Sequence, residues 1–330
     1  MIRFLSTGYI SRYLLVFFLG LIIWLPSLLY PTGYSGVPSY AYNLLAEIFP
    51  QNNYFLTTIS FLLTLFSAIL LNKYAIDTGL VGKVSTLVIA LFIVFSSALV
   101  EEYHNNPIIW INLILIFVWG NLMQLPYTKN TIPLIFNASF LIGIASLFYT
   151  PLILLFAFIW LSIFIHRIVT WRNLVVTIIG VTLPYFFLLT ICYALDIMLE
   201  ESYVLFNSLK VEMMLKITNS PIEMIVLVIL TFLIIISALG IAGKLNEKNI
   251  NLRRNLLITI VLLLVVFIIL MVFTKSIASL LLLCIPSALL VGNWLSYVKR
   301  LRWYNFALTI LTILIVINQY VHLITDLLEA

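Results

Sequence analysis

Long uninterrupted apolar runs, separated by short polar segments, are the dominant pattern along this chain. A helix needs about 20 predominantly apolar residues to cross about 30 Å of hydrocarbon. Eleven runs of roughly this length occur, which predicts an all-α, polytopic bundle of about eleven transmembrane helices. The expected spans are residues 11–30, 55–72, 84–100, 108–125, 132–149, 151–166, 173–195, 221–243, 255–274, 276–297 and 303–325.

The apolar stretch at residues 132–166 admits two interpretations. Pro151 interrupts it, and proline both lacks an amide donor and disfavours helical geometry in the preceding residue. A break at Tyr149–Pro151 is therefore expected. Two short spans, 132–149 and 151–166, are one solution, and a re-entrant pair is the alternative.

Composition excludes other classes of protein. The 330 residues are 64% hydrophobic and only 9% charged, whereas about 25% of the residues of a soluble domain are charged. The segments between the spans are too short to fold independently, so we expect one transmembrane domain over residues 1–330. The net charge of +5 resides in short loops, which indicates topology signals and no nucleic-acid partner.

The distribution of charge predicts the orientation. With the N-terminus in the cytoplasm, 14 of the 17 Lys and Arg residues fall in cytoplasmic segments, as the positive-inside rule requires. The C-terminus is then outside. Cytoplasmic loops are expected at residues 73–83, 126–131, 167–172, 244–254 and 298–302. Outer loops are expected at residues 30–54, 101–107 and 196–220.

Most acidic residues fall on the predicted outer side, and four polar residues there are candidates for catalysis. Glu47 lies in the first outer loop, and Glu101, Glu102 and His104 lie in the second. Carboxylates and an imidazole beside a membrane surface can take a proton from an acceptor hydroxyl or hold a divalent cation. The alternative is that these residues are solvated loop charges.

Basic residues on both sides could bind phosphate. Lys210 and Lys216, in the third outer loop, could pair with the phosphate of a substrate. On the cytoplasmic side, Arg167, Arg172 and the cluster at 299–302 could bind anionic lipid headgroups. The positive-inside rule explains these cytoplasmic residues equally well as topology signals. His166 stands at a cytoplasmic helix end, where a cation complements the helix dipole.

Familiar catalytic motifs are absent from the sequence. It contains no His-Glu-x-x-His, no Gly-x-Ser-x-Gly, and no glycine-rich nucleotide-binding loop. No ionisable residue lies near the centre of a predicted span, which disfavours proton or sodium coupling. The polar residues within the spans are amides, which we expect to bond neighbouring helices. These are Asn112, Asn121, Gln124, Asn137, Asn293, Asn318 and Gln319.

A resemblance to a known family begins at residue 136. The run Phe136–Pro151, the pairs His166-Arg167 and Trp171-Arg172, and the run Gly180–Tyr185 resemble an uncharacterised family of inner-membrane proteins of Gram-negative bacteria. The resemblance implies a bacterial inner-membrane location and supplies no activity. Some members have been called beta-carotene monooxygenases, but that chemistry needs more than the three histidines present here.

A second resemblance is to GT-C-type membrane glycosyltransferases. A span rich in small residues around Gly143, the break at Pro151, a basic turn and a proline-bearing span are similar to the middle of those enzymes. The resemblance implies a polyprenyl-phosphate-linked sugar as substrate and an acid in the first outer loop, here Glu47. This first loop is shorter than is usual in that family, and no large outer C-terminal domain follows.

Three functions remain open from the sequence. The first is a GT-C-like protein that acts on or binds polyprenyl-linked sugars at the outer face, with Glu47 as base or metal ligand. The second is a non-catalytic subunit or scaffold of an envelope complex, which would depend on a lipid-facing stripe at Gly143, Ala145 and Ser146. The third is a transporter of lipid or hydrophobic solute, with the amides lining its path.

Overall fold

The computed structural model of the chain describes residues 10–31, 52–82, 85–98, 106–194, 221–273, 277–298 and 301–329. Within these ranges the chain is helical and contains no strand. The α-helices are α2 (Ile10–Leu29), α4 (Asn53–Asp77), α5 (Leu87–Ser96), α6 (Pro107–Gln124), α7 (Ile132–Phe148), α8 (Phe156–His166), α9 (Trp171–Ala194), α11 (Pro221–Ala242), α12 (Ile250–Phe273), α13 (Cys284–Tyr297) and α14 (Leu301–Glu329). Short 3-10 helices are η1 (Leu125–Tyr127), η2 (Thr150–Leu155), η3 (Leu245–Glu247) and η4 (Ile277–Leu283).

The length and composition of these helices show a multi-pass membrane protein. In the part of the chain that the structure describes, eight helical stretches are long and apolar enough to cross a membrane. Three further apolar stretches are shorter: Leu87–Ser96, Ile132–Phe148 and Thr150–His166. The predicted helical membrane bundle is thus confirmed. Each of the eleven expected spans coincides with one of these stretches.

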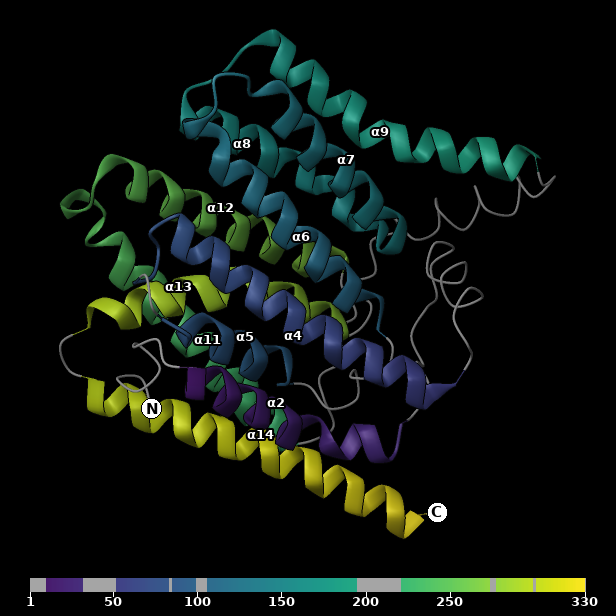
Figure 1. Ribbon diagram of the computed structural model, residues 1–330, viewed down its shortest axis with the longest axis vertical. Helices are drawn as coiled ribbons and strands as arrows, with labels where there is room; N and C mark the ends of the chain where they lie inside the picture. The colour runs from purple at the N-terminus through teal and green to yellow at the C-terminus, as the bar shows by residue number, and fades with distance from the viewer. Residues whose placement is uncertain are drawn as a thin grey trace.

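The helices lie side by side in one elongated bundle (Figure 1). Helix α9 forms one edge and packs on α7, which in turn packs on α6. At the other edge α14 contacts both α2 and α11. Helices α4, α5 and α13 lie between these edges.

The centre of the bundle is built around a helix that is too short to cross a bilayer. Helix α5 has 10 residues, so it rises about 15 Å, roughly half of the hydrocarbon thickness. Residues Leu87–Phe95 of α5 are all buried, and the helix packs on α4 and α13. Neighbouring helices therefore surround it on all sides.

The predicted break at Pro151 is confirmed. Helix α7 ends at Phe148, the chain continues as the 3-10 helix η2, and α8 begins at Phe156. The hydroxyl of Tyr149, in this turn, donates a hydrogen bond of 3.0 Å to the carbonyl of Phe273 at the end of α12. The start of α7 and the end of α8 line one groove. The two segments therefore form a hairpin that returns to the face where it began.

Glycines allow α7 and α9 to approach closely. A Cβ atom on Gly143 would lie 2.7 Å from the carbonyl oxygen of Val181, and one on Gly180 would lie 2.0 Å from Oγ of Ser139. The small residues at 143, 145 and 146 are buried within the bundle. The expectation that they form a lipid-facing stripe was wrong. Gly143 and Ser146 contact Val181 and Tyr185 of α9, and Ala145 is fully buried.

The connections at one end of the bundle define what we call the basic face. They are residues 78–82, 125–131, 167–170, 243–249 and 298. The ten Lys and Arg residues within the described ranges all lie in or near these connections or at the adjoining helix ends. These connections coincide with the loops that the positive-inside rule predicted to be cytoplasmic, and the orientation itself stays a prediction.

Candidate functional site

The residues predicted to act at the outer face lie outside the described residues. They are Glu47, Glu101, Glu102, His104, Lys210 and Lys216. Their roles, and the divalent cation that the acids were expected to hold, stay predictions. Within the described ranges no group of three or more His, Cys, Asp or Glu residues could hold a metal ion.

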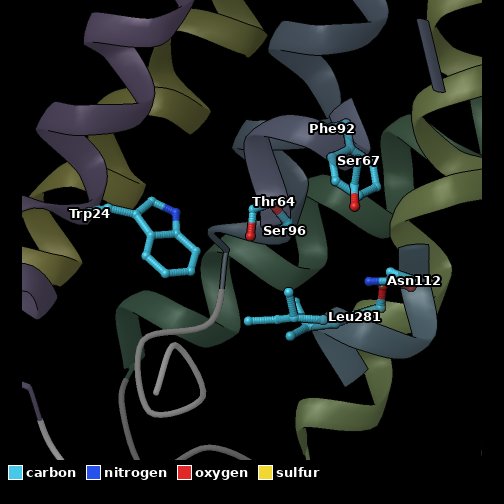
Figure 2. A pocket seen from close by; sticks show the side chains of 8 residues that line it. Trp24, Thr64, Ser67, Phe92, Ser96, Asn112 and Leu281 are labelled. Carbon is cyan, nitrogen blue, oxygen red and sulfur yellow. The ribbon is translucent and has the colours of Figure 1, made fainter. Parts of the chain in front are cut away.

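A small cavity with polar and apolar lining residues lies inside the bundle, next to the end of α5 (Figure 2). Its lining side chains come from five elements: α2, α4, α5, α6 and η4. They are Trp24, Thr64, Ser67, Phe92, Ser96, Ile109, Asn112 and Leu281. Asn112 Nδ2 donates to the carbonyl of Leu281 (3.2 Å), which holds α6 against η4.

Two oxygen atoms beside this cavity have no hydrogen-bond partner within the described residues. They are Ser67 Oγ and Asn112 Oδ1. The volume of the cavity is about 10 Å³, which is close to the minimum for one water molecule. The cavity therefore suits a structural water and is too small for a sugar or a lipid headgroup.

A larger groove opens on the basic face, and we call it the basic groove. Its volume is about 780 Å³, within the range of about 300–1,000 Å³ typical of ligand sites. It lies where the ends of α6 and α8 meet the starts of α7, α9 and α12. Its lining residues are Leu125, Pro126, Thr128, Lys129, Asn130, Thr131, Ile132, His166, Ile168, Thr170, Trp171, Arg172, Asn173, Asn251 and Arg254.

Short-range hydrogen bonds fix the loops of the basic groove. Asn130 Oδ1 accepts from the amide of Ile132 at the start of α7 (3.3 Å). Thr170 Oγ1 accepts from the amide of Asn173 at the start of α9 (3.3 Å). Asn173 Nδ2 donates to the carbonyl of Ile168 (2.7 Å). The first turns of α7, α9 and α12 also border the groove. Helix N-termini carry partial positive charge.

Three permanent cations line the basic groove. Lys129, Arg172 and Arg254 all border it, and the described residues that line it include no Asp or Glu. None of the three forms an ion pair with a carboxylate of the described residues. The groove therefore concentrates positive charge without internal neutralisation, which favours an anion.

His166 is a buried polar side chain of the basic groove, as is Asn173. It ends α8 as predicted, but it is only 5% exposed. The Leu122 carbonyl and Arg254 lie near it, yet neither ring nitrogen makes a hydrogen bond of normal geometry in the described structure. An imidazole always carries at least one N–H donor. A buried donor without an acceptor is costly, so an acceptor from a ligand or water would stabilise this ring.

A second polar cluster on the basic face holds loops together. Lys248 Nζ donates to Asn293 Oδ1 (2.8 Å) and lies 4.4 Å from the ring centroid of Tyr297. Asn293 Nδ2 in turn donates to the carbonyl of Leu80. Burial, with a smaller contribution from Lys244, lowers the pKa of Lys248. The hydrogen bonds of this cluster join the connections at residues 78–82 and 243–249 to α13.

Sequence reasoning found only part of the basic groove. It singled out Arg172 and His166 as cytoplasmic residues, but it did not group them with Lys129 and Arg254. These four residues are separated by up to 125 positions, and no local motif joins them. The available signal was that each stands in a predicted cytoplasmic loop or at its edge.

Comparison with known proteins identifies the family of the chain but no activity. A family model described as "Family of unknown function (DUF6427)" matches residues 40–327. No curated protein and no solved structure matches the chain. The match covers most of the chain, and it confirms the expectation of an uncharacterised family. The protein belongs to the DUF6427 family.

Proposed function

We propose that this DUF6427 membrane protein binds a lipid that carries phosphate, and that the basic groove holds the headgroup. The observation that carries the proposal is the grouping of Lys129, Arg172 and Arg254 around one groove without a carboxylate in its lining. Phosphate is the anionic group that lipids present at this depth, and arginine binds it through paired hydrogen bonds.

Aromatic residues support a position of the basic groove at the level of lipid headgroups. Trp171, on its rim, is 70% exposed, and Tyr127, in the adjoining turn η1, is 62% exposed. Tryptophan and tyrosine are enriched where hydrocarbon meets water. A lipid could then place its phosphate in the groove while its chains remain in the bilayer.

The proposal is compatible with the substrate that the sequence predicted. A polyprenyl-linked sugar carries phosphate, and a GT-C-like protein acting on it at the outer face would use Glu47, Glu101, Glu102 and His104. That outer-face chemistry is a separate prediction. If Glu47→Gln left envelope glycan assembly unchanged, the catalytic role of Glu47 would be rejected while headgroup binding stood.

Lipid binding can be tested with the intact protein. We expect the protein purified in mild detergent to retain anionic phospholipid, detected by native mass spectrometry. The double variant Arg172→Gln, Arg254→Gln should lose most of this lipid, because two of the three groove cations are removed. Lys73→Gln, Arg302→Gln is the matched control, since both residues are exposed near the basic face and do not line the groove. Equal retention by the two double variants would refute the proposal.

A further inference from the structure

We infer that the basic groove selects a phosphate group with two or more negative charges, a phosphomonoester or diphosphate, over a singly charged phosphodiester. This inference rests on the proposed function and specifies the class of ligand. Three observations support it: the charge of the groove, the geometry of its donors, and the unsatisfied ring of His166.

The first observation is the balance of charge. Lys129, Arg172 and Arg254 contribute three positive charges, and no lining residue is acidic. A phosphodiester brings a single negative charge and would leave two cations unneutralised. A phosphomonoester carries about −1.5 to −2 at neutral pH, and a diphosphate carries more. The groove therefore gains the most from a multiply charged group.

The second observation is the kind of donor that lines the basic groove. Each guanidinium offers a planar fork of N–H groups that matches two phosphate oxygens. The starts of α7, α9 and α12 border the same space and carry partial positive charge, although the amides of Ile132 and Asn173 already donate to neighbouring side chains. A monoester or a diphosphate presents more unsubstituted oxygens than a diester, so it can accept more of these hydrogen bonds.

The third observation concerns His166. This ring is 5% exposed and lines the basic groove. The Leu122 carbonyl lies near it, but neither nitrogen makes a hydrogen bond of normal geometry among the described residues. Arg254 lies near it, so an anion beside Arg254 could also accept from the imidazole. A terminal phosphate oxygen is such an acceptor, and it would give this buried ring a hydrogen bond of better geometry than the Leu122 carbonyl provides.

The test compares probes that differ in charge. The full chain in phosphatidylcholine nanodiscs is titrated with pyrophosphate, inorganic phosphate and dimethyl phosphate by calorimetry. We expect pyrophosphate to bind at least about ten-fold more tightly than dimethyl phosphate, since the latter carries one charge and two blocked oxygens. Nanodiscs that also contain phosphatidate should weaken pyrophosphate binding, whereas nanodiscs with phosphatidylglycerol should not. Competition by phosphatidate would identify a lipid-borne phosphate as the ligand. Pyrophosphate binding without competition by phosphatidate would identify a soluble phosphate as the ligand.

Variants separate the groove from general attraction to a basic surface. Arg172→Gln, Arg254→Gln should abolish the preference for pyrophosphate, and Lys73→Gln, Arg302→Gln should retain it. His166→Phe removes the imidazole donor and keeps all three cations. We therefore expect pyrophosphate affinity to fall several-fold through loss of this hydrogen bond alone. Thermal unfolding checks that the variant is folded. Equal affinity for pyrophosphate and dimethyl phosphate, both lost in the arginine variant, would overturn the selectivity and leave the proposed function intact. Absence of binding by every probe and both anionic lipids would overturn both.

Discussion

At the scale of single residues, buried amides connect distant parts of the chain. Asn293 bonds both Lys248 and the Leu80 carbonyl, and Asn255 Nδ2 donates to the carbonyl of Thr78 (3.2 Å). Asn112 bonds η4 in the same way. The expectation that amides within the spans bond neighbouring helices is confirmed at Asn112 and at Asn318, whose Nδ2 donates to Glu223 Oε1 of α11 (3.5 Å). Asn293 instead bonds two connections of the basic face. Other predicted amides, such as Gln124 and Asn137, are exposed.

Replacing Asn293 should test the strength of one such connection. Asn293→Leu leaves the Leu80 carbonyl and the half-buried Lys248 ammonium without this partner, so we expect a loss of about 1–3 kcal/mol in the free energy of unfolding. Denaturation in detergent measures it. The double variant with Lys248→Met should lose less than the sum of the single variants, because the unpaired charge is gone. Strict additivity would show that the Lys248–Asn293 bond contributes nothing.

Close approach of two backbones makes Gly143 a sensitive position. A Cβ there would lie 2.7 Å from the backbone oxygen of Val181, which no side-chain rotation can relieve. Gly143→Ala should therefore destabilise the protein by about 1–3 kcal/mol. Gly82→Ala is the matched control, because nothing lies within 4 Å of a Cβ at that position. Equal melting temperatures for the two variants would contradict the α7–α9 packing.

At the scale of elements, helices of similar composition differ in how deeply they are buried. Helix α5 is enclosed by its neighbours, whereas α9 turns a row of large apolar residues outward, including Phe186 and Phe187. Both helices are strongly apolar, because lipid-facing and protein-facing positions in a membrane protein carry the same kinds of residue. Hydrophobicity alone could not distinguish the inner helix from the peripheral one.

Matched phenylalanine truncations should reveal this difference. Phe92 in α5 is 1% exposed, and Phe186 in α9 is 66% exposed. Phe92→Ala leaves a cavity inside the bundle, so we expect a cost of about 3–5 kcal/mol. At Phe186 lipid can fill the space, and the loss should be about 1 kcal/mol or less. Unfolding in lipid nanodiscs would measure both, and a larger loss for Phe186→Ala would place α9 against an unseen partner.

At the scale of the whole molecule, the connections separate into a basic face and an opposite face. The two native cysteines, Cys192 and Cys284, are buried, so introduced cysteines can report orientation. A membrane-impermeant thiol reagent should label Asn52→Cys from outside sealed cells and Asn130→Cys only after permeabilisation. Both residues are exposed. The reverse pattern would place the basic face outside and contradict the predicted orientation.

The sequence by itself determined that the chain is a helical membrane protein, where its helices lie, that it breaks at Pro151 and where its basic loops fall. These properties follow from the length of apolar runs, from proline and from charge, and each can be read locally. The tertiary structure decided that α5 is enclosed, that Gly143 faces α9, and that Lys129, His166, Arg172 and Arg254 line one groove. Such features depend on which helices are neighbours, and in a uniformly apolar chain no local pattern encodes that choice, because a lipid tail and a leucine provide nearly the same surroundings.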